Sequence, residues 1–486
     1  MSNPSDSPHA QATIVLQQCL GSSVSVDAKD LFEKSFDGMK VAFQTDAVVR
    51  PREESEVGTL LELANQHRVP VTTRGVGSTL TGSAAPRYGG WVLDLSGLSE
   101  FEIDPLTNFC HAQAGAVTGE IQDVAAAQGR FYPPDPSSLK WCTIGGNIAC
   151  NAGGLRCVKY GVTRDYVVAL EGYLPTGEHV KFGRDLKKFS SGYNLRDLWI
   201  GSEGMLGVVT RATLKLIPAP RSRQTFLAAF ARERAVLESV QELLSDGLVH
   251  PSILEFLDCL SVKGAEGCIG RSLFPESPAS PLLLVEVDGH PAQVLEDTAI
   301  VEKWLGRNAI TFLKSNTEEE AEELWQVRRQ CSGAMFKLAN SKLNQDVVVP
   351  IRREADLVDF IATVREETGL PIAVFGHAGD GNLHVNVMYD RSSIETREIA
   401  AHAVKMVMEE VVALGGSISG EHGIGLAKTA YTDLEFGAAE FATMKAIKKT
   451  LDPRNILNPG KLFEPFEPWR HDPVDVQLPW DTQYPE

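Results

Sequence analysis

The sequence predicts an α+β protein with at least two domains, and three observations support this prediction. The 486 residues are enough for two or three domains with sizeable cores. In the first part of the chain, short apolar runs alternate with helical patterns and with two glycine-rich segments, residues 71–82 and 134–154. After the Pro-Ala-Pro run at 218–220, β-α-β patterns with a different spacing follow, so we place a domain boundary at this run.

Composition and charge narrow the class of protein. A hydrophobic content of 43% and a charged content of 23% are typical of a soluble globular protein. The net charge of −18 argues against nucleic acid or an anionic membrane surface as a partner. No apolar run approaches the length of a bilayer span and residues 1–9 are polar, so we expect a cytoplasmic protein. The eight cysteines include no CxxC pair, which leaves zinc ribbons and ferredoxin-type clusters unsupported, and we expect no disulfide framework.

The first half of the chain reads as a lead-in followed by strand and helix candidates. Apolar spacing predicts helices at residues 10–20 and 51–68. Runs of β-branched and alternating residues predict strands at 69–73, 91–95, 109–114, 167–174, 178–182 and 208–217.

The second half predicts two β-α-β passes. Strands are expected at 225–230, 253–257, 282–287 and 309–313, with helices at 232–245 and 292–305 between them. This order is typical of an α+β domain of ferredoxin-like type. Further helices are expected at 318–329, 354–368 and 393–414.

The glycine-rich segment at 134–154 has four glycines within its last ten residues. Such a segment is not expected to form a core helix or strand, because glycine costs backbone entropy there and packs nothing. It suits a place where backbone N–H groups approach an anion while hydroxyls and amides meet ring heteroatoms. A single Gly-Gly pair would indicate a surface loop, but two pairs flanked by Pro and Ser favour a binding role.

Residues 71–82 combine glycines with one arginine, Arg74, after a β-branched run. Glycine allows close approach and arginine supplies charge, which is the chemistry of a pyrophosphate cradle. No GxGxxG opens a helix here, so a Rossmann nicotinamide site is disfavoured.

A second informative stretch covers residues 372–388. A strand at 372–375, a turn at 378–381 and a returning strand at 383–388 would bring His377 and His384 near each other, with Asn386 on the same face as His384. Two imidazoles and one carboxylate leave positions on a metal open for substrate, as a catalytic ion requires. Glu421 and His422 lie in another glycine-bounded loop. A lone His is more often structural, and spacing alone does not bring these four residues together.

The two glycine-rich segments resemble the flavin-binding module of the vanillyl-alcohol oxidase and p-cresol methylhydroxylase superfamily, over roughly residues 40–220 and again at the C-terminus. The resemblance implies a two-part flavin-binding domain of the p-cresol methylhydroxylase type, an inserted α+β cap, and a C-terminal segment that returns to the flavin domain. The implied divisions are a lead-in at 1–45, the FAD-binding domain at 46–220, a substrate and metal domain at 221–430, and the C-terminal segment at 431–486.

The same resemblance implies FAD, held without a covalent bond because the first glycine-rich segment lacks the His that tethers the flavin in many relatives. The residues that match FAD-contacting positions are Arg74, Gly75, Gly77, Ser78, Thr79, Gly82, Pro136, Ser137, Ser138, Thr143, Gly145, Gly146, Asn147, Asn151, Gly153, Gly154, Glu203, Gly207, Val208 and Asn458.

Residues 375–386 and 421–422 resemble the metal-dependent flavin 2-hydroxyacid dehydrogenases, the group of D-lactate dehydrogenase, the glycolate oxidase flavin subunit and D-2-hydroxyglutarate dehydrogenase. In that group the equivalents of His377, His384 and Glu421 hold a divalent ion, with zinc favoured over manganese or iron here. The equivalent of Asn386 contacts substrate and that of His422 is the catalytic base. Residues 325–328 resemble the substrate-arginine motif of this group, which implies that Arg328, and Ser332 one turn further on, bind the substrate.

The implied reaction is oxidation of a small D-2-hydroxyacid to the 2-oxoacid, with hydride passing to flavin N5. Electrons would leave for a quinone, an electron-transfer flavoprotein or an iron-sulfur partner subunit. Asn344 stands where the 2-hydroxyglutarate enzymes have a lysine, and Lys342 is near but out of register, so D-lactate or glycolate is favoured.

Four other functions remain open: a D-2-hydroxyglutarate dehydrogenase, an alkylglycerone-phosphate synthase-like transferase without net redox turnover, an electron-relay subunit, and a metal hydrolase without flavin. A homodimer or a subunit of a larger complex is expected, in the cytoplasm or held at the inner face of a membrane through a partner.

Overall fold

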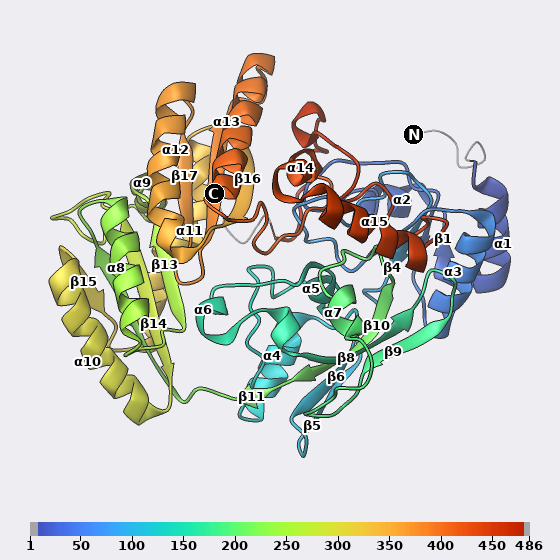
Figure 1. Ribbon diagram of the computed structural model, residues 1–486, viewed down its shortest axis with the longest axis horizontal. Helices are drawn as coiled ribbons and strands as arrows, with labels where there is room; N and C mark the ends of the chain where they lie inside the picture. The colour runs from blue at the N-terminus through green and yellow to red at the C-terminus, as the bar shows by residue number, and fades with distance from the viewer. Residues whose placement is uncertain (1–7, 481–486) are drawn as a thin grey trace. The chain divides into compact units, whose positions relative to one another are not determined.

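The computed structural model describes residues 8–480, and the chain divides into two compact units (Figure 1). Of the described residues, unit 1 contains 8–154, Val162–Pro218 and Glu421–Trp480, and unit 2 contains Leu155–Gly161 and Ala219–Gly420. The division after Pro218 falls at the Pro-Ala-Pro run, whereas the second falls ten residues before the expected end at 430. Residues 1–7 and 481–486, with most of the polar N-terminal stretch considered above, lie outside the described part.

One sheet of unit 1 is built around a parallel core. Its order is β1-β2-β4-β3, in which β2, β4 and β3 run parallel. The bounds are Val24–Ser25 for β1, Ala47–Val49 for β2, Val71–Arg74 for β3 and Trp91–Asp94 for β4. Helix α3 (Ser55–His67) connects β2 to β3 and buries Val57, Leu60, Leu61 and Ala64. This is the connection that parallel strands require, and it confirms the expected strand–helix–strand order.

The second sheet of unit 1 is antiparallel, with the order β5-β6-β10-β8-β9. Its central strand, β10 (Val208–Lys215), alternates buried residues with more exposed ones over most of its length. The other strands are β5 (Phe101–Asp104), β6 (Phe109–Gln113), β8 (Val167–Tyr173) and β9 (His179–Gly183), and β7 (Arg130–Phe131) pairs with β11 (Ile217–Pro218). The remaining helices of unit 1 are α1 (Ala10–Leu20), α2 (Ala28–Glu33), α4 (Thr118–Ala127), α5 (Ile144–Cys150), α7 (Leu195–Trp199), α14 (Thr432–Glu435) and α15 (Ala438–Leu451).

The C-terminal segment belongs to unit 1 because it joins the parallel sheet. The backbone N–H of Val71 donates to the carbonyl of Ile456 at 2.7 Å, and the N–H of Asn458 donates to the carbonyl of Val71 at 2.8 Å. The buried ammonium of Lys448 on α15 also donates to the carbonyls of Met205 and Leu457. The expected return of the C-terminus to the flavin-binding domain is therefore present.

One expectation about the glycine-rich segment is wrong, since residues 144–150 form helix α5. Ile144 and Ile148 are buried on one face of this helix, and a Cβ added at Gly145 would lie 2.8 Å from the Cβ of Ala114. Glycine therefore allows the helix to pack directly on the neighbouring backbone, and this tertiary contact overrides the low helix propensity of the segment. Asn151, with φ +52°, ends the helix.

Unit 2 contains a seven-stranded antiparallel sheet in the order β15-β12-β14-β13-β17-β18-β16. Its strands are β12 (Ser222–Ala229), β13 (Ile253–Leu257), β14 (Leu282–Gly289), β15 (Thr311–Lys314), β16 (Ser341–Val348), β17 (Ile372–His377) and β18 (Asn382–Tyr389). The first four strands along the chain occupy positions 4-1-3-2, which is the ferredoxin-like arrangement expected from the two β-α-β passes. Strand β16 was not expected.

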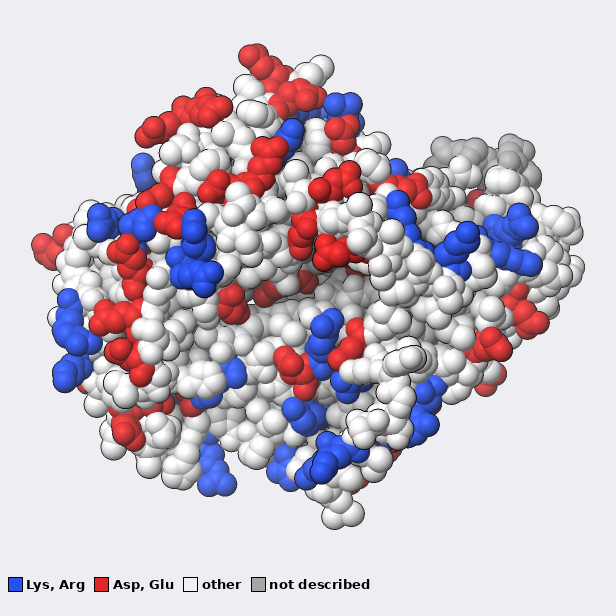
Figure 2. All heavy atoms as spheres, in the orientation of Figure 1, with Lys and Arg blue, Asp and Glu red and all other residues white. Residues whose placement is uncertain are grey.

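Helices cover both faces of this sheet (Figure 1). One face carries α8 (Glu233–Asp246), α10 (Pro291–Asn308), α12 (Glu354–Thr368) and α13 (Ile394–Ala413). The other face carries α9 (Cys259–Ile269) and α11 (Glu318–Ala334), and the short helix α6 (Cys157–Tyr160) also belongs to unit 2. Figure 2 shows acidic side chains gathered over the ends of α12 and α13. Among residues 8–480, no helix has the length and apolar character that crossing a bilayer demands.

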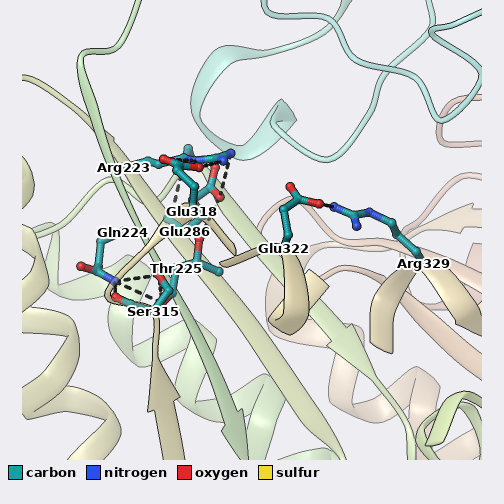
Figure 3. Close-up of polar contacts among 9 residues, drawn as sticks. Arg223, Gln224, Thr225, Glu286, Ser315, Glu318, Glu322 and Arg329 are labelled. Carbon is teal, nitrogen blue, oxygen red and sulfur yellow. Dashed lines mark hydrogen bonds and ion pairs between the residues drawn. The ribbon is translucent and has the colours of Figure 1, made fainter. Parts of the chain in front are cut away.

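Polar contacts fix the start of α11 against the sheet (Figure 3). The guanidinium of Arg223 on β12 donates a hydrogen bond to the carboxylate of Glu318 in the first turn of α11. A guanidinium nitrogen of Arg223 also lies 4.0 Å from a carboxylate oxygen of Glu286 on β14. The hydroxyl of Thr225 donates to Glu286 at 3.1 Å. These contacts set the position of the helix that carries Arg328.

Candidate functional site

Two of the proposed metal ligands, His377 and His384, share one face of the sheet in unit 2 with Asn386. Directly opposed residues of antiparallel strands point to the same side, and side chains alternate along each strand. The pairs are Glu255 with His377, Phe375 with His384, and Asn344 with Asn386. This is the face covered by α9 and α11, because Leu257, Leu284 and Phe375 pack there with Leu324, Trp325 and Val327 of α11.

His377 and His384 lie next to each other, as the predicted hairpin requires. Their ring centroids are 5.3 Å apart with an interplanar angle of 87°. One ligand atom from each of His377, His384 and Glu421 lies within 4.8 Å of the other two. Both imidazoles are buried, at 4% and 8% exposure. The structure therefore brings together the three residues that sequence reasoning named as ligands but could not place.

Asp346 holds Gly420, the residue before Glu421, within unit 2. The backbone N–H of Gly420 donates to the carboxylate of Asp346 at 3.1 Å, and the side-chain amide of Asn382 donates to the same carboxylate at 2.7 Å. Asp346 on β16 is directly opposite His384 on β18. Gly420 is therefore held beside the pair of strands that carries His384.

Glu255 connects the proposed metal ligand His377 to Arg328. The fully buried carboxylate of Glu255 is hydrogen-bonded to Nδ1 of His377 and accepts from Nε of Arg328 at 2.5 Å. Burial by itself would raise the pKa of Glu255, but the charges and hydrogen bonds of His377 and Arg328 hold it below its ordinary value. An ionised Glu255 accepts a hydrogen bond from Nδ1–H of His377, which leaves Nε2 of His377 as its ligand nitrogen. Two imidazoles, one carboxylate and this supporting carboxylate fit a divalent ion such as zinc.

Arg328, Ser332 and Asn386 lie on the same side of the sheet as these ligands. The guanidinium of Arg328 lies 4.7 Å from the ring centroid of Phe375, which is itself 5.8 Å from the ring of His384. The amide nitrogen of Asn386 donates to the carbonyl of His384 at 3.0 Å, and its buried Oδ1 has no hydrogen-bond partner within residues 8–480. An unpaired buried acceptor suits a ligand that donates a proton.

In unit 1, Glu203 and Asn458 connect several loops through hydrogen bonds. The carboxylate of Glu203 accepts from the N–H groups of Ile424 and Gly425, both at 2.8 Å. The amide of Asn458 donates to the carbonyls of Ser83 and Glu203, both at 2.7 Å. These contacts fix the loop that carries His422.

Arg74 makes contacts that differ from the expected phosphate contact. Its guanidinium donates to four backbone carbonyls, those of Lys34, Phe36, Gly75 and Val76. Arg74 is also 6% exposed. These bonds assign it to shaping the glycine-rich loop, and its contact with the pyrophosphate stays a prediction.

The remaining FAD residues fit a cofactor cradle in part. A Cβ added at Gly146 would meet only the hydroxyl of Thr143, at 3.5 Å, so the backbone is open on this side. The buried Oδ1 of Asn458 has no partner in the described part of the chain, which suits a donor from a bound ring. In contrast, Gly154 packs against Asp135 and Gly207 against Trp199, so those glycines also serve the protein's own packing.

Sequence reasoning missed Glu255 and Asp346, the two carboxylates that position the proposed ligands. Glu255 had a signal, because a charged residue in the apolar run at 253–257 marks a buried charge in need of a partner.

The fold and these residues define a flavoprotein with an FAD-binding domain and a separate substrate domain. Residues 45–183 match the profile of the FAD binding domain, and residues 219–462 match that of the FAD linked oxidases, C-terminal domain. The chain belongs to the FAD-linked oxidases. It is an FAD-linked oxidoreductase of the group that includes D-lactate dehydrogenase and glycolate oxidase.

Relatives agree with this family, and a solved structure agrees with the fold. The glycolate oxidase subunit GlcD of Bacillus subtilis (strain 168) is 39% identical over 420 residues, which cover 86% of this chain and 89% of the relative. A D-lactate dehydrogenase of Anaerostipes hadrus is 36% identical over 431 residues, with coverage of 86% and 89%. A structure of p-cresol methylhydroxylase with substrate bound superposes with a TM-score of 0.77 at 17% identity, covering 93% of this chain and 96% of that one. The predicted p-cresol methylhydroxylase-type fold is confirmed.

Proposed function

We propose that the protein oxidises a small D-2-hydroxyacid to the 2-oxoacid and depends on both FAD and a divalent metal ion. The observation that carries this proposal is the group His377, His384 and Glu421 with Glu255 behind His377. The names of the relatives, D-lactate dehydrogenase and glycolate oxidase subunit, supply the substrate class. From the sequence, D-lactate or glycolate is favoured and zinc is the favoured ion.

In this proposal, some residues of the chain bind the substrate and one removes its proton. Arg328 pairs with the substrate carboxylate through its terminal nitrogens while its Nε stays on Glu255. Asn386 accepts a hydrogen bond from the substrate through Oδ1, and Ser332 lies one helical turn beyond Arg328. His422 removes the hydroxyl proton as general base. When bound, FAD would supply a hydride acceptor for C2, and a divalent ion held by His377, His384 and Glu421 would supply a Lewis acid for the substrate hydroxyl.

Electron transfer onward needs an external acceptor, which we propose to be a quinone, an electron-transfer flavoprotein or an iron-sulfur partner subunit. The name of the Bacillus subtilis relative describes a subunit, which supports membership of a larger complex. We propose a cytoplasmic location or attachment to a membrane face through such a partner.

Two rival functions make different predictions for the same assay. A transferase of the alkylglycerone-phosphate synthase type would hold FAD but would not be reduced by a hydroxyacid. An electron-relay subunit would be reduced only through its partner.

The test is anaerobic mixing of the purified protein with D-lactate or glycolate. Bleaching of the flavin with one equivalent of 2-oxoacid formed per flavin is the expected result. Unchanged flavin absorbance with every D-2-hydroxyacid would contradict the proposal. Acid or heat should release intact FAD, whereas flavin retained in the precipitate would mean a covalent bond.

A further inference from the structure

Residues 155–161 interrupt the FAD-binding part of the chain, because they belong to unit 2 while the residues directly before and after them belong to unit 1. The two ends of this excursion are bonded to each other in unit 1. The N–H and the hydroxyl of Thr163 both donate to the carbonyl of Ala152, at 3.1 and 2.8 Å. Residues 153–162 therefore form one connecting loop, whose ends are fixed in unit 1 and whose middle is built into unit 2.

The first end of the connecting loop carries residues that were predicted to contact FAD, among them Asn151 and Gly154. The side chain of Asn151 accepts a hydrogen bond from the N–H of Arg164 at 2.9 Å. A Cβ added at Gly154 would lie 2.5 Å from the carbonyl oxygen of Asp135, so the backbone packs closely there. A change in the position of the connecting loop would therefore move the backbone that is proposed to meet the flavin.

Asp288 on β14 holds the middle of the connecting loop within unit 2. The ammonium of Lys159 donates to Oδ1 of Asp288 at 2.6 Å and to its backbone carbonyl at 2.5 Å. The hydroxyl of Tyr160 donates to the same Oδ1 at 2.8 Å. Asp288 is 4% exposed, and breaking a buried pair leaves an uncompensated charge, so this contact resists opening.

Two apolar side chains of the connecting loop lie on the hairpin side of unit 2. Leu155 packs against the apolar cluster between the sheet and α11. Val158 contacts the turn that joins β17 to β18, because a Cβ added at Gly379 would lie 2.5 Å from Cγ2 of Val158. His377 and His384 stand on the two strands that this turn joins. The connecting loop therefore touches the segment between two proposed metal ligands.

We propose that the connecting loop couples FAD binding to divalent metal binding, so that each ligand raises the affinity for the other. The inference rests on the proposed function, since it takes the two histidines to be metal ligands. With an ion bound, the turn at Gly379 is held on both sides, and the contacts of Val158 and Asp288 keep the loop in its position. FAD then meets an ordered loop and loses less conformational entropy on binding. Asp288 acts in this proposal as a positioning residue for the flavin.

The experiment measures the dissociation constant of FAD for the full-length protein freed of flavin and metal, from the quenching of flavin fluorescence. Saturating zinc should lower the Kd of FAD about tenfold, a size typical of coupled sites. Saturating FAD should lower the Kd of zinc by the same factor, because such coupling is reciprocal. A Kd of FAD that is equal with and without zinc would overturn the inference.

Variants locate the coupling in the connecting loop. Asp288→Asn and Val158→Ala should each reduce the tenfold factor to below about threefold, while FAD alone and zinc alone bind within about threefold of the wild type. Asp297→Asn is the matched control, since Asp297 is equally buried in unit 2 but bonds Gln293 on α10, and it should keep the full factor. Lys159→Met added to Asp288→Asn should change nothing further, because both substitutions remove the same contact.

The single-ligand affinities distinguish lost coupling from a damaged fold, because an unfolded variant would bind neither FAD nor zinc. A full tenfold factor in both Asp288→Asn and Val158→Ala would show that the connecting loop does not carry the coupling. If the wild type binds both ligands without coupling and a hydroxyacid still bleaches its flavin, the inference fails and the proposed function stands. If the protein binds no divalent ion, the metal part of the proposed function fails, and the inference fails with it.

Discussion

Glu255 and His377 are directly opposed on neighbouring strands β13 and β17, and their side chains are hydrogen-bonded in the buried interior of unit 2. The two residues are 122 positions apart in the sequence. Because Glu255 also holds Arg328, one carboxylate orients a proposed metal ligand and the proposed substrate arginine together. Metal binding and substrate binding are therefore expected to depend on the same buried residue.

The first prediction follows from this contact. Glu255→Gln should weaken divalent metal binding about 10–100-fold while FAD stays bound, because supporting hydrogen bonds orient the ligand and raise its basicity. Metal titration followed by elemental analysis measures the effect. Glu286→Gln is the matched control, since Glu286 is also buried on this sheet but bonds Thr225. Equal metal affinity in both variants would mean that Glu255 does not support a metal site.

The second prediction separates a ligand from a base. His384→Ala should lose metal and turnover but keep FAD, whereas His422→Ala should keep both cofactors and lose turnover by about 10²–10⁴-fold. Excess chelator should inactivate the wild type, and zinc or manganese should restore it. Stoichiometric metal and normal flavin bleaching in His384→Ala would show that these histidines are structural.

The third prediction contrasts two adjacent glycines. Gly146→Val should lose FAD while the fold survives, because only the Thr143 hydroxyl lies near the added side chain. Gly145→Val should destabilise the protein itself, because Ala114 lies 2.8 Å from the added Cβ. Flavin absorbance and thermal unfolding of both variants test this contrast. Full flavin content in Gly146→Val would show that residues 145–154 are not at the cofactor.

The sequence predicted best those helices and strands whose bounds follow from the pattern of neighbouring residues. Residues 253–257 and 354–368 form a strand and a helix with the expected bounds, since apolar spacing alone specifies them. The approach of His377 to His384 was also predictable, because a short turn joins their strands. The contact of Glu255 with His377 was not, since it depends on the order of strands in the sheet, which no local pattern determines.

Two other features were hidden for physical reasons. Strand β16 carries the polar residues Lys342, Asn344 and Asp346 on the face that α11 covers. The usual pattern, with apolar residues on the buried face, is therefore absent, and the sequence alone did not indicate a strand. Helix α5 contains Gly145 and Gly146, whose low helix propensity was outweighed by packing against Ala114.

The last prediction concerns the pH dependence of stability and Lys461. The side chain of Lys461 is 1% exposed in unit 1, its ammonium donates to the carbonyl of Ala85 at 2.5 Å, and burial lowers its pKa from 10.5 to about 7. Between these two values the unfolded chain binds the proton and the folded protein does not. The free energy of unfolding therefore gains a contribution that grows as pH rises from about 7 towards 10, and that is lost as pH falls through 7.

Replacement by Met removes this titration. The stability of the wild type relative to Lys461→Met should rise with pH between about 7.5 and 9.5, at a slope of up to about 1.4 kcal/mol per pH unit. Asp37, whose pKa burial raises to about 6, titrates below this window. Lys449→Met, at an exposed position of α15, should remain parallel to the wild type at every pH. Melting temperatures of the three proteins across the window decide the matter, and a difference between wild type and Lys461→Met that is flat in pH would mean that Lys461 keeps its proton in the folded protein.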